Sequence, residues 1–195
     1  MTIKKYYNIA KTKLFPITRS LTGDGVRKTL NIIQKEFPKL KIKKIKSGVK
    51  VFDWKIPEEW NVTDAYVIDK FNNKIIDFKK NNLHLVGYSI PCNKFISKKE
   101  LFNHIHSLPR QPKAIPYITS YYKKYWGFCL SYNQYKKILK KYNNTSKFKI
   151  NINTNFKKNG NLKYGELILK GKTKNEIIVS TYLCHPSMAN NELSG

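Results

Sequence analysis

Residues 177–195, IIVSTYLCHPSMANNELSG, hold the feature that most restricts the possible folds of this chain. The apolar stretch 176–184 predicts a buried β-strand, which delivers His185 at its carboxyl end. Open α/β sheets present their sites at the carboxyl ends of strands, so the pattern predicts an α/β fold with a site at His185. Polar residues of the kinds that ligate metals follow in a short loop: Asn190, Asn191, Glu192 and Ser194.

His185 is therefore the leading candidate for a metal ligand. Zinc accepts histidine nitrogen and carboxylate oxygen, so His185 with Asn191 or Glu192 forms a candidate zinc shell. A lone histidine is more often structural, and Ser194 as a nucleophile is a weaker alternative because no base lies near it in the sequence. An open zinc site needs about three protein ligands. We therefore expect the 195-residue chain to be catalytically silent by itself.

The net charge of +26 raises nucleic-acid binding as an alternative function. Only Arg19, Arg27 and Arg110 are arginines among the 38 basic residues. Nucleic-acid surfaces favour arginine for bidentate and stacking contacts. Here lysine is spread along the chain together with Asn and Ile, as an AT-rich coding bias would produce. The composition thus makes nucleic acid a less favoured candidate for the partner of this protein.

The remaining composition indicates a protein of a reducing compartment. No run of about 18 apolar residues predicts a transmembrane helix, and the first residues lack the apolar core of a signal peptide. The cysteines, Cys92, Cys129 and Cys184, are odd in number and widely spaced, which indicates free thiols. We expect a cytoplasmic protein with no membrane partner.

The periodicity of apolar residues predicts mixed α and β structure. A helix is expected over 20–38, with Thr22 or Asp24 as its cap, and a capping box at Ser97–Glu100 predicts a short helix to about residue 107. A further short helix is expected over 132–142. Strands are predicted at 40–46, 49–54, 64–68, 75–78, 148–153, 165–169 and 176–184.

The densest aromatic cluster, residues 117–131, has two interpretations. It could stack against sugar rings, peptide side chains or bases, and Tyr121, Tyr122 and Trp126 are the residues that we expect to line such a substrate pocket. Packing into the core is the simpler alternative. The pair His104 and His106 is expected to be structural, because residues i and i+2 of a helix point in different directions.

Several segments, taken in order, resemble the bacterial zinc-aminopeptidase-like family, whose members are linked to polysaccharide biosynthesis. The matching segments are LFPITRSLTG at 14–23, VFDW at 51–54, PEEW at 57–60, GYSIP at 87–91, IPYITSYY at 115–122, WGFCLS at 126–131, YGE at 164–166, CHPS at 184–187 and LSG at 193–195.

The resemblance implies an α/β fold in which a partial zinc-aminopeptidase-like αβα core is interrupted by an inserted β-rich α+β domain. The core would be 1–40 with 145–195, and the insert 41–144. Related co-catalytic zinc aminopeptidases carry a His that corresponds to His185 and an Asp that corresponds to Asn191. Asparagine is a neutral and poorer bridge between two zinc ions, so Glu192 substitutes for it, or the site holds one zinc or none.

The function that the resemblance implies is that of the N-terminal part of a zinc-dependent aminopeptidase-like hydrolase. Its substrate would be a small peptide-like or amide-containing molecule, and its cofactor one or two zinc ions. Two alternatives remain open. One is a non-catalytic binding protein with a degenerate peptidase fold, which Asn191 favours; the other is the basic nucleic-acid-binding module.

Overall fold

The structure, a computed structural model, describes residues 3–187 as parts of two compact units. Unit 1 takes Met1–Trp60 and Phe156–Gly195, and unit 2 takes Asn61–Asn155. The sequence predicted boundaries after residues 40 and 144, whereas the units divide after residues 60 and 155. Residues 41–46 belong to unit 1 because they pair with a strand that follows residue 160.

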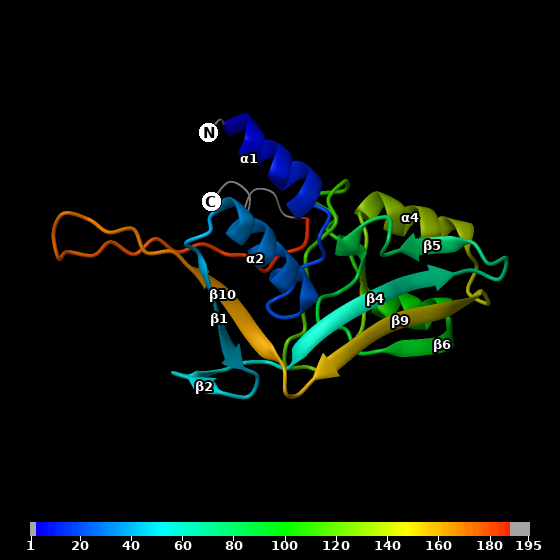
Figure 1. The fold of residues 1–195 in the computed structure, drawn as a ribbon. Coiled ribbons are helices and arrows are strands. Elements are labelled where there is room, and N and C mark those ends of the chain that lie inside the picture. Colours follow the sequence, from blue (N-terminus) through cyan, green and yellow to red (C-terminus); the bar gives the residue numbers. More distant parts are fainter. Residues whose placement is uncertain (1–2, 188–195) are drawn as a thin grey trace. The chain divides into compact units, whose positions relative to one another are not determined.

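Unit 1 combines two helices with two small antiparallel sheets (Figure 1). Strand β1 pairs with β10 from Lys41 opposite Glu166 to Lys46 opposite Asn161. Leu30 of the second helix is buried, and a Cβ at Gly165 of β10 would lie 3.2 Å from it, so this helix packs on β10. The elements are α1 (Ile3–Ile9), the π-helical turn η1 (Ala10–Leu14), α2 (Asp24–Glu36), β1 (Lys41–Lys46), β2 (Lys50–Val51), β3 (Trp54–Lys55) and β10 (Asn161–Glu166).

Helix α2 is the predicted N-terminal helix, but it is shorter than predicted and starts differently. Neither Thr22 nor Asp24 caps it, because Gly23 is the N-cap at φ 95° with no side-chain cap. A positive φ of this kind favours glycine. The Thr22 hydroxyl instead accepts the backbone N–H of Trp60 at 3.1 Å, and Asp24 pairs with Arg27.

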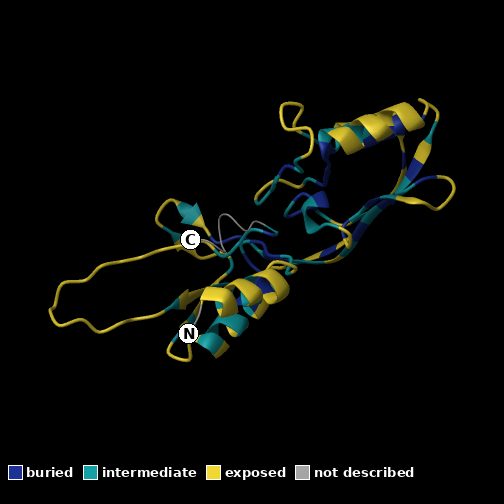
Figure 2. Cartoon of the chain, turned by 90° about the horizontal axis from the view of Figure 1, so that it is seen from above, coloured by how far each residue is buried: buried dark blue, intermediate teal, exposed yellow. Residues whose placement is uncertain are grey.

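The prediction of a β-strand at 176–184 is wrong, as residues 167–187 show. They have no helix or strand, and the side chains of Ile177, Ile178 and Val179 are 92%, 88% and 90% exposed. A strand needs a partner for its backbone N–H and C=O groups, and none of the described residues pairs with this segment. Figure 2 shows it as a long exposed loop. The described part of unit 1 is thus mixed α/β with small sheets, without the implied three-layer core.

The exposed apolar segment leads to a prediction about association. Contiguous exposed apolar surface drives proteins to associate, so we expect this 195-residue polypeptide to form concentration-dependent oligomers in sedimentation velocity. Ile177→Lys with Val179→Lys should restore a monomer. The matched control, Thr173→Lys with Asn175→Lys, adds the same charge at exposed polar positions and should leave the oligomers in place. A monomeric parent chain would contradict the prediction.

Unit 2 is built on a four-stranded sheet of order β5-β4-β9-β6. Its core contains Val67, Ile76, Ile96, Phe148 and Ile150, all at most 3% exposed. The elements are β4 (Glu59–Ile68), β5 (Lys74–Asp77), the 3-10 turn η2 (Asn82–His84), β6 (Cys92–Ser97), α3 (Lys98–Asn103), β7 (Ile105–His106), β8 (Phe128–Cys129), α4 (Tyr132–Lys141) and β9 (Lys147–Lys157).

The two helices of unit 2 begin at side-chain caps. The Ser97 hydroxyl accepts the Glu100 N–H at 3.2 Å, but the predicted capping box is incomplete because the Glu100 carboxylate pairs with Lys94. The chain leaves α3 at His104 and forms β7, a short strand parallel to β8, so the helix ends before the predicted residue 107. A complete capping box between Ser131 and Gln134 starts α4.

Asp69, in the turn between β4 and β5, is a buried carboxylate with a pH-dependent role. Burial alone would raise its pKa, but N–H groups of Asn73 and Phe71 and the Tyr142 hydroxyl, 2.8 Å away, donate to it and lower the pKa to about 2. An unfolded Asp has a pKa of about 3.9. The depressed pKa therefore stabilises the fold above about pH 4, and that contribution disappears as the pH falls through about 2.

We accordingly expect Asp69→Asn to lower the free energy of unfolding by about 2.5 kcal/mol at pH 5. The difference between wild type and variant should shrink steadily as the pH falls toward about 2. Urea titrations at a series of pH values measure it. A difference that does not change with pH would show that Asp69 is not ionised with a lowered pKa in the folded protein.

Candidate functional site

His185 lies in unit 1, where a buried arginine holds its backbone. The Arg19 side chain is 2% exposed. Its Nε donates to the carbonyl oxygen of His185 at 3.0 Å, and its Nη1 donates to the carbonyl oxygen of Leu14 at 2.6 Å. A guanidinium presents several donors in a rigid, planar fork. One side chain therefore joins residue 14 to residue 185.

The segment that carries Arg19 packs closely against the first turn of α2. A Cβ at Gly25 would lie 1.9 Å from the carbonyl oxygen of Thr18, so the first turn of α2 approaches this segment as closely as only glycine permits. The buried Thr22 hydroxyl fixes the other end through the N–H of Trp60. Residues 14–25 thus form a support for His185, and this contact was not predicted from the sequence.

The imidazole of His185 is half-buried and lies between two neighbouring side chains. The Cys184 Sγ lies 3.8 Å from His185 Nδ1, and the Tyr182 ring meets the imidazole edge-on with 6.0 Å between ring centroids. Pro186 is buried, and Ser187 has φ 46°, an unusual left-handed conformation for serine. The chain therefore turns sharply directly after the histidine.

The described residues supply only part of a metal shell. Residues 3–187 contain no group of three or more His, Cys, Asp or Glu side chains that could hold a metal ion. The other predicted ligands, Asn191 and Glu192, lie outside the described residues. His185 could offer one ring nitrogen to a metal, with Cys184 beside it. These residues alone do not form a zinc site.

A second cluster of charges in unit 1 is structural. Arg27 Nη2 donates to Glu59 Oε1 at 2.8 Å, and the N–H of Asn161 donates to Glu59 Oε2 at 3.1 Å. The hydrogen bond to Glu59 is the main cause that raises the pKa of Arg27. The Glu59 side chain is 4% exposed and joins α2, β4 and the turn before β10. Sequence reasoning gave this carboxylate no role.

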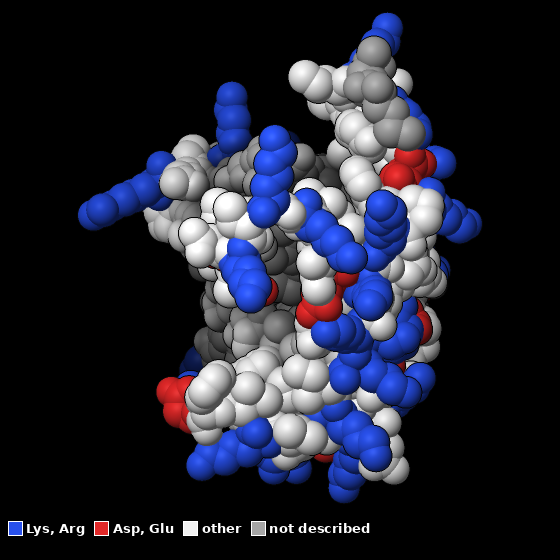
Figure 3. All heavy atoms as spheres, turned by 60° about the vertical axis from the view of Figure 1, so that its left-hand side comes forward, with Lys and Arg blue, Asp and Glu red and all other residues white. Residues whose placement is uncertain are grey.

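These contacts bear on the nucleic-acid alternative. Arg19 and Arg27, two of the three arginines, are engaged in contacts inside unit 1, and only Arg110 is exposed. Figure 3 shows lysine and arginine side chains spread over the face in view, with carboxylates among them. Arginine thus serves internal packing more than the surface, and the charge alone does not favour nucleic acid.

The other histidines, all in unit 2, make structural contacts. His104 Nδ1 donates to the carbonyl oxygen of Trp126 at 2.7 Å, and its ring stacks on that indole at 3.7 Å. His84 donates to the carbonyl oxygen of Cys129 at 2.7 Å, and burial lowers the pKa of His84. His106 is hydrogen-bonded to the Tyr125 hydroxyl at 2.8 Å.

The predicted substrate-binding aromatics also lie in unit 2, in different environments. Trp126 is 7% exposed and packs against His104 and Phe128. Tyr121 is half-buried, with its ring edge-on to Tyr88 at 4.9 Å, whereas Tyr122 is 61% exposed. Trp126 thus has the contacts of a core residue, and a role in substrate binding remains a prediction for Tyr121, Tyr122 and Trp126.

The cysteines match the prediction of free thiols. Burial raises the pKa of Cys129 to about 12, so this thiol is unreactive near neutral pH. No helix within residues 3–187 has both the length and the apolar character that crossing a membrane requires.

Comparison with known proteins gives consistent results. The family model described as "Domain of unknown function (DUF4910)" matches residues 7–195. A Clostridium acetobutylicum protein named "Putative polysaccharide biosynthesis protein with aminopeptidase-like domain" is 46% identical over 189 residues, which cover 97% of this chain and 42% of that protein. A crystal structure of a "putative peptidase" from the same organism matches with a TM-score of 0.89 and 45% identity, over 98% of this chain and 43% of that one.

Proposed function

The chain belongs to the family described as Domain of unknown function (DUF4910), and we propose that it forms the N-terminal part of an aminopeptidase-like hydrolase. Its substrate would be a small molecule with a peptide or amide bond, within surface polysaccharide biosynthesis. The names of the two relatives support this class of function. The chain spans less than half the length of either relative. The aminopeptidase activity is therefore proposed for the whole protein and not for this chain by itself.

The fixed position of His185 is the observation that carries the proposal. A buried guanidinium needs strong partners, and Arg19 finds one of them in the backbone of His185. A histidine without a functional role on an exposed loop would not need a buried arginine to bind its backbone. The arrangement supports a role in which the imidazole must be held in one place, as a metal ligand must.

Zinc is the cofactor that we propose for this site, as one or two ions. His185 would be one ligand, Asn191 or Glu192 would share the shell, and further ligands would come from the rest of the protein. Bound zinc would polarise the substrate carbonyl and lower the pKa of a bound water toward about 7. We further propose that unit 2 is a domain inserted into the peptidase core.

Aminopeptidase assays on the whole protein test the proposed function. We expect release of p-nitroaniline from a panel of aminoacyl p-nitroanilides, loss of that activity with a chelator, and recovery on adding zinc. No hydrolysis by zinc-loaded protein would favour the second candidate, a non-catalytic binding protein with a degenerate peptidase fold. The observation in favour of that candidate is Asn191, at the position where the resemblance implies a bridging carboxylate.

A further inference from the structure

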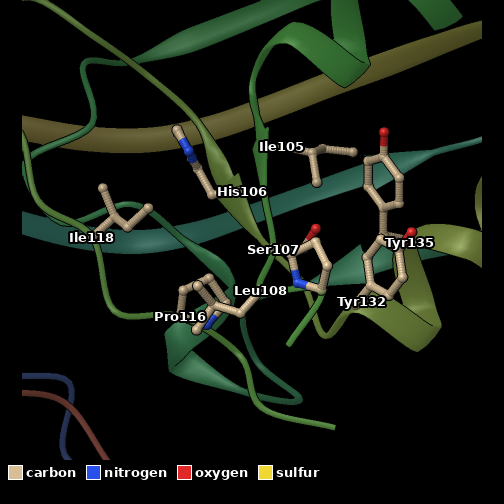
Figure 4. A pocket seen from close by; sticks show the side chains of 9 residues that line it. Ile105, His106, Ser107, Leu108, Pro116, Ile118, Tyr132 and Tyr135 are labelled. Atoms are coloured by element: carbon tan, nitrogen blue, oxygen red, sulfur yellow. The ribbon is translucent and has the colours of Figure 1, made fainter. Parts of the chain in front are cut away.

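Unit 2 contains a pocket of about 390 Å³ that none of the predicted site residues lines (Figure 4). Its walls come from β7 and the loop that follows it on one side, and from the first turns of α4 on the other. The volume falls within the range of about 300–1,000 Å³ that is usual for small-molecule sites. The lining residues are Ile105, His106, Ser107, Leu108, Pro109, Pro116, Ile118, Tyr132 and Tyr135.

The two tyrosines form an aromatic wall whose position is fixed by the helix. Tyr132 and Tyr135 are three residues apart, so they share one face of α4, and their rings stack at 5.8 Å with 14° between planes. The capping box at Ser131 sets where the helix begins, and the Phe102 ring supports Tyr135 edge-on at 4.9 Å. The wall therefore exists before any ligand arrives.

The opposite wall is held by backbone hydrogen bonds. The N–H of Leu130 donates to the carbonyl oxygen of His106 at 2.9 Å, and the N–H of Asn133 donates to the carbonyl oxygen of Pro112 at 3.0 Å. The second bond ties the loop of residues 107–118 to the start of α4. Both walls of the pocket are thus parts of one unit and are joined to each other.

The residues that line the pocket are themselves uncharged, with apolar faces and a few polar groups, and the Lys136 ammonium lies 5.1 Å from the centroid of the Tyr132 ring. No Lys, Arg, Asp or Glu is among the residues that line it. Burial is the main cause that lowers the pKa of His106, with a smaller effect of His104, so the His106 imidazole is neutral near pH 7. Ser107, Tyr132 and Tyr135 add hydroxyl groups to this lining, and these can bind hydroxyl groups of a ligand.

We propose that this pocket binds an uncharged saccharide ring. One face of a pyranose carries C–H groups, which pack on the electron-rich face of an aromatic ring, while its hydroxyls both donate and accept hydrogen bonds. Tyr132 and Tyr135 supply the aromatic face, and Ser107 and the tyrosine hydroxyls supply the polar partners. The choice of a saccharide over other neutral ligands rests on the proposed function, through its link to polysaccharide biosynthesis.

Saturation-transfer difference NMR of the 195-residue chain tests the proposal with named probes. These are the methyl glycosides of glucose, galactose and N-acetylglucosamine, and a decaproline peptide. We expect transfer to at least one glycoside and none to the peptide. Tyr132→Ala should weaken that binding at least tenfold, whereas Phe95→Ala, which removes a 72% exposed aromatic ring of the same unit, should not change it.

A second variant keeps the test decisive if Tyr132→Ala fails to fold. Leu108 is 41% exposed at the pocket, so Leu108→Lys adds a charge there without removing a core residue, and it should also abolish transfer. Absence of transfer to every glycoside would overturn the proposal, as would transfer that persists in both variants or transfer to the peptide alone. No zinc is present, so this result is independent of the aminopeptidase assay.

Discussion

Replacing Arg19 with alanine is expected to lower the free energy of unfolding by roughly 3 kcal/mol or more. The substitution leaves two backbone carbonyls without their donor, that of Leu14 in a buried site and that of His185 in a part-buried one. Each buried polar group left unsatisfied costs about 1–3 kcal/mol, and the lost volume adds a cavity penalty. Urea unfolding measures the loss, and amide exchange at Cys184, His185 and Ser187 should accelerate because their anchor is gone.

Two further variants separate this role from charge alone. Arg110→Ala removes the same charge from an exposed position and should change stability by less than about 0.5 kcal/mol. Arg19→Lys keeps the charge but has no planar fork, so it cannot hold both carbonyls and should still destabilise the protein. An Arg19→Ala protein as stable as wild type would contradict the role of Arg19 as the anchor of His185.

Replacing His185 with alanine is expected to weaken zinc binding by the whole protein at least about 100-fold. Groups that merely orient metal ligands are worth about 10–100-fold in affinity, and a direct ligand contributes more. Isothermal titration of metal-free protein with zinc measures the change. Thermal stability without metal should change little, because the His185 side chain is half-buried and the bond with Arg19 uses its backbone oxygen.

The matched control for this variant is His104→Asn. Asparagine keeps an N–H donor near the position of Nδ1, so it can still reach the carbonyl oxygen of Trp126. We expect zinc affinity to be unchanged by it. If His185→Ala also leaves the affinity unchanged, His185 is not a ligand and the metal-site proposal fails.

The sequence predicted where α2 and α3 lie, but not the cap of α2 or the end of α3. Helix α2 follows from the spacing of Val26 and Leu30, and α3 starts at the cap that Ser97 predicts. The predicted strand at 176–184 failed because apolar character shows that a segment prefers burial but not whether a partner strand is available. Ile177, Ile178 and Val179 of this segment stay exposed.

The hydrogen bond that holds the backbone of His185 was not predicted, because it joins two residues that are distant in sequence. Arg19 and His185 are 166 residues apart, and no local pattern connects them. One signal was available, since an arginine in a chain that otherwise uses lysine marks a position where a planar fork is required. Arg27 fits the same rule through its hydrogen bond to Glu59, 32 residues away.

The most direct test of the account is to locate zinc itself in crystals of the whole protein, with an anomalous difference map at the zinc edge. The account predicts a peak about 2.0–2.1 Å from a ring nitrogen of His185. It also predicts that the Arg19 guanidinium still bonds to the backbone of that residue. Zinc bound elsewhere, or a fully zinc-loaded protein with no peak at His185, would contradict it.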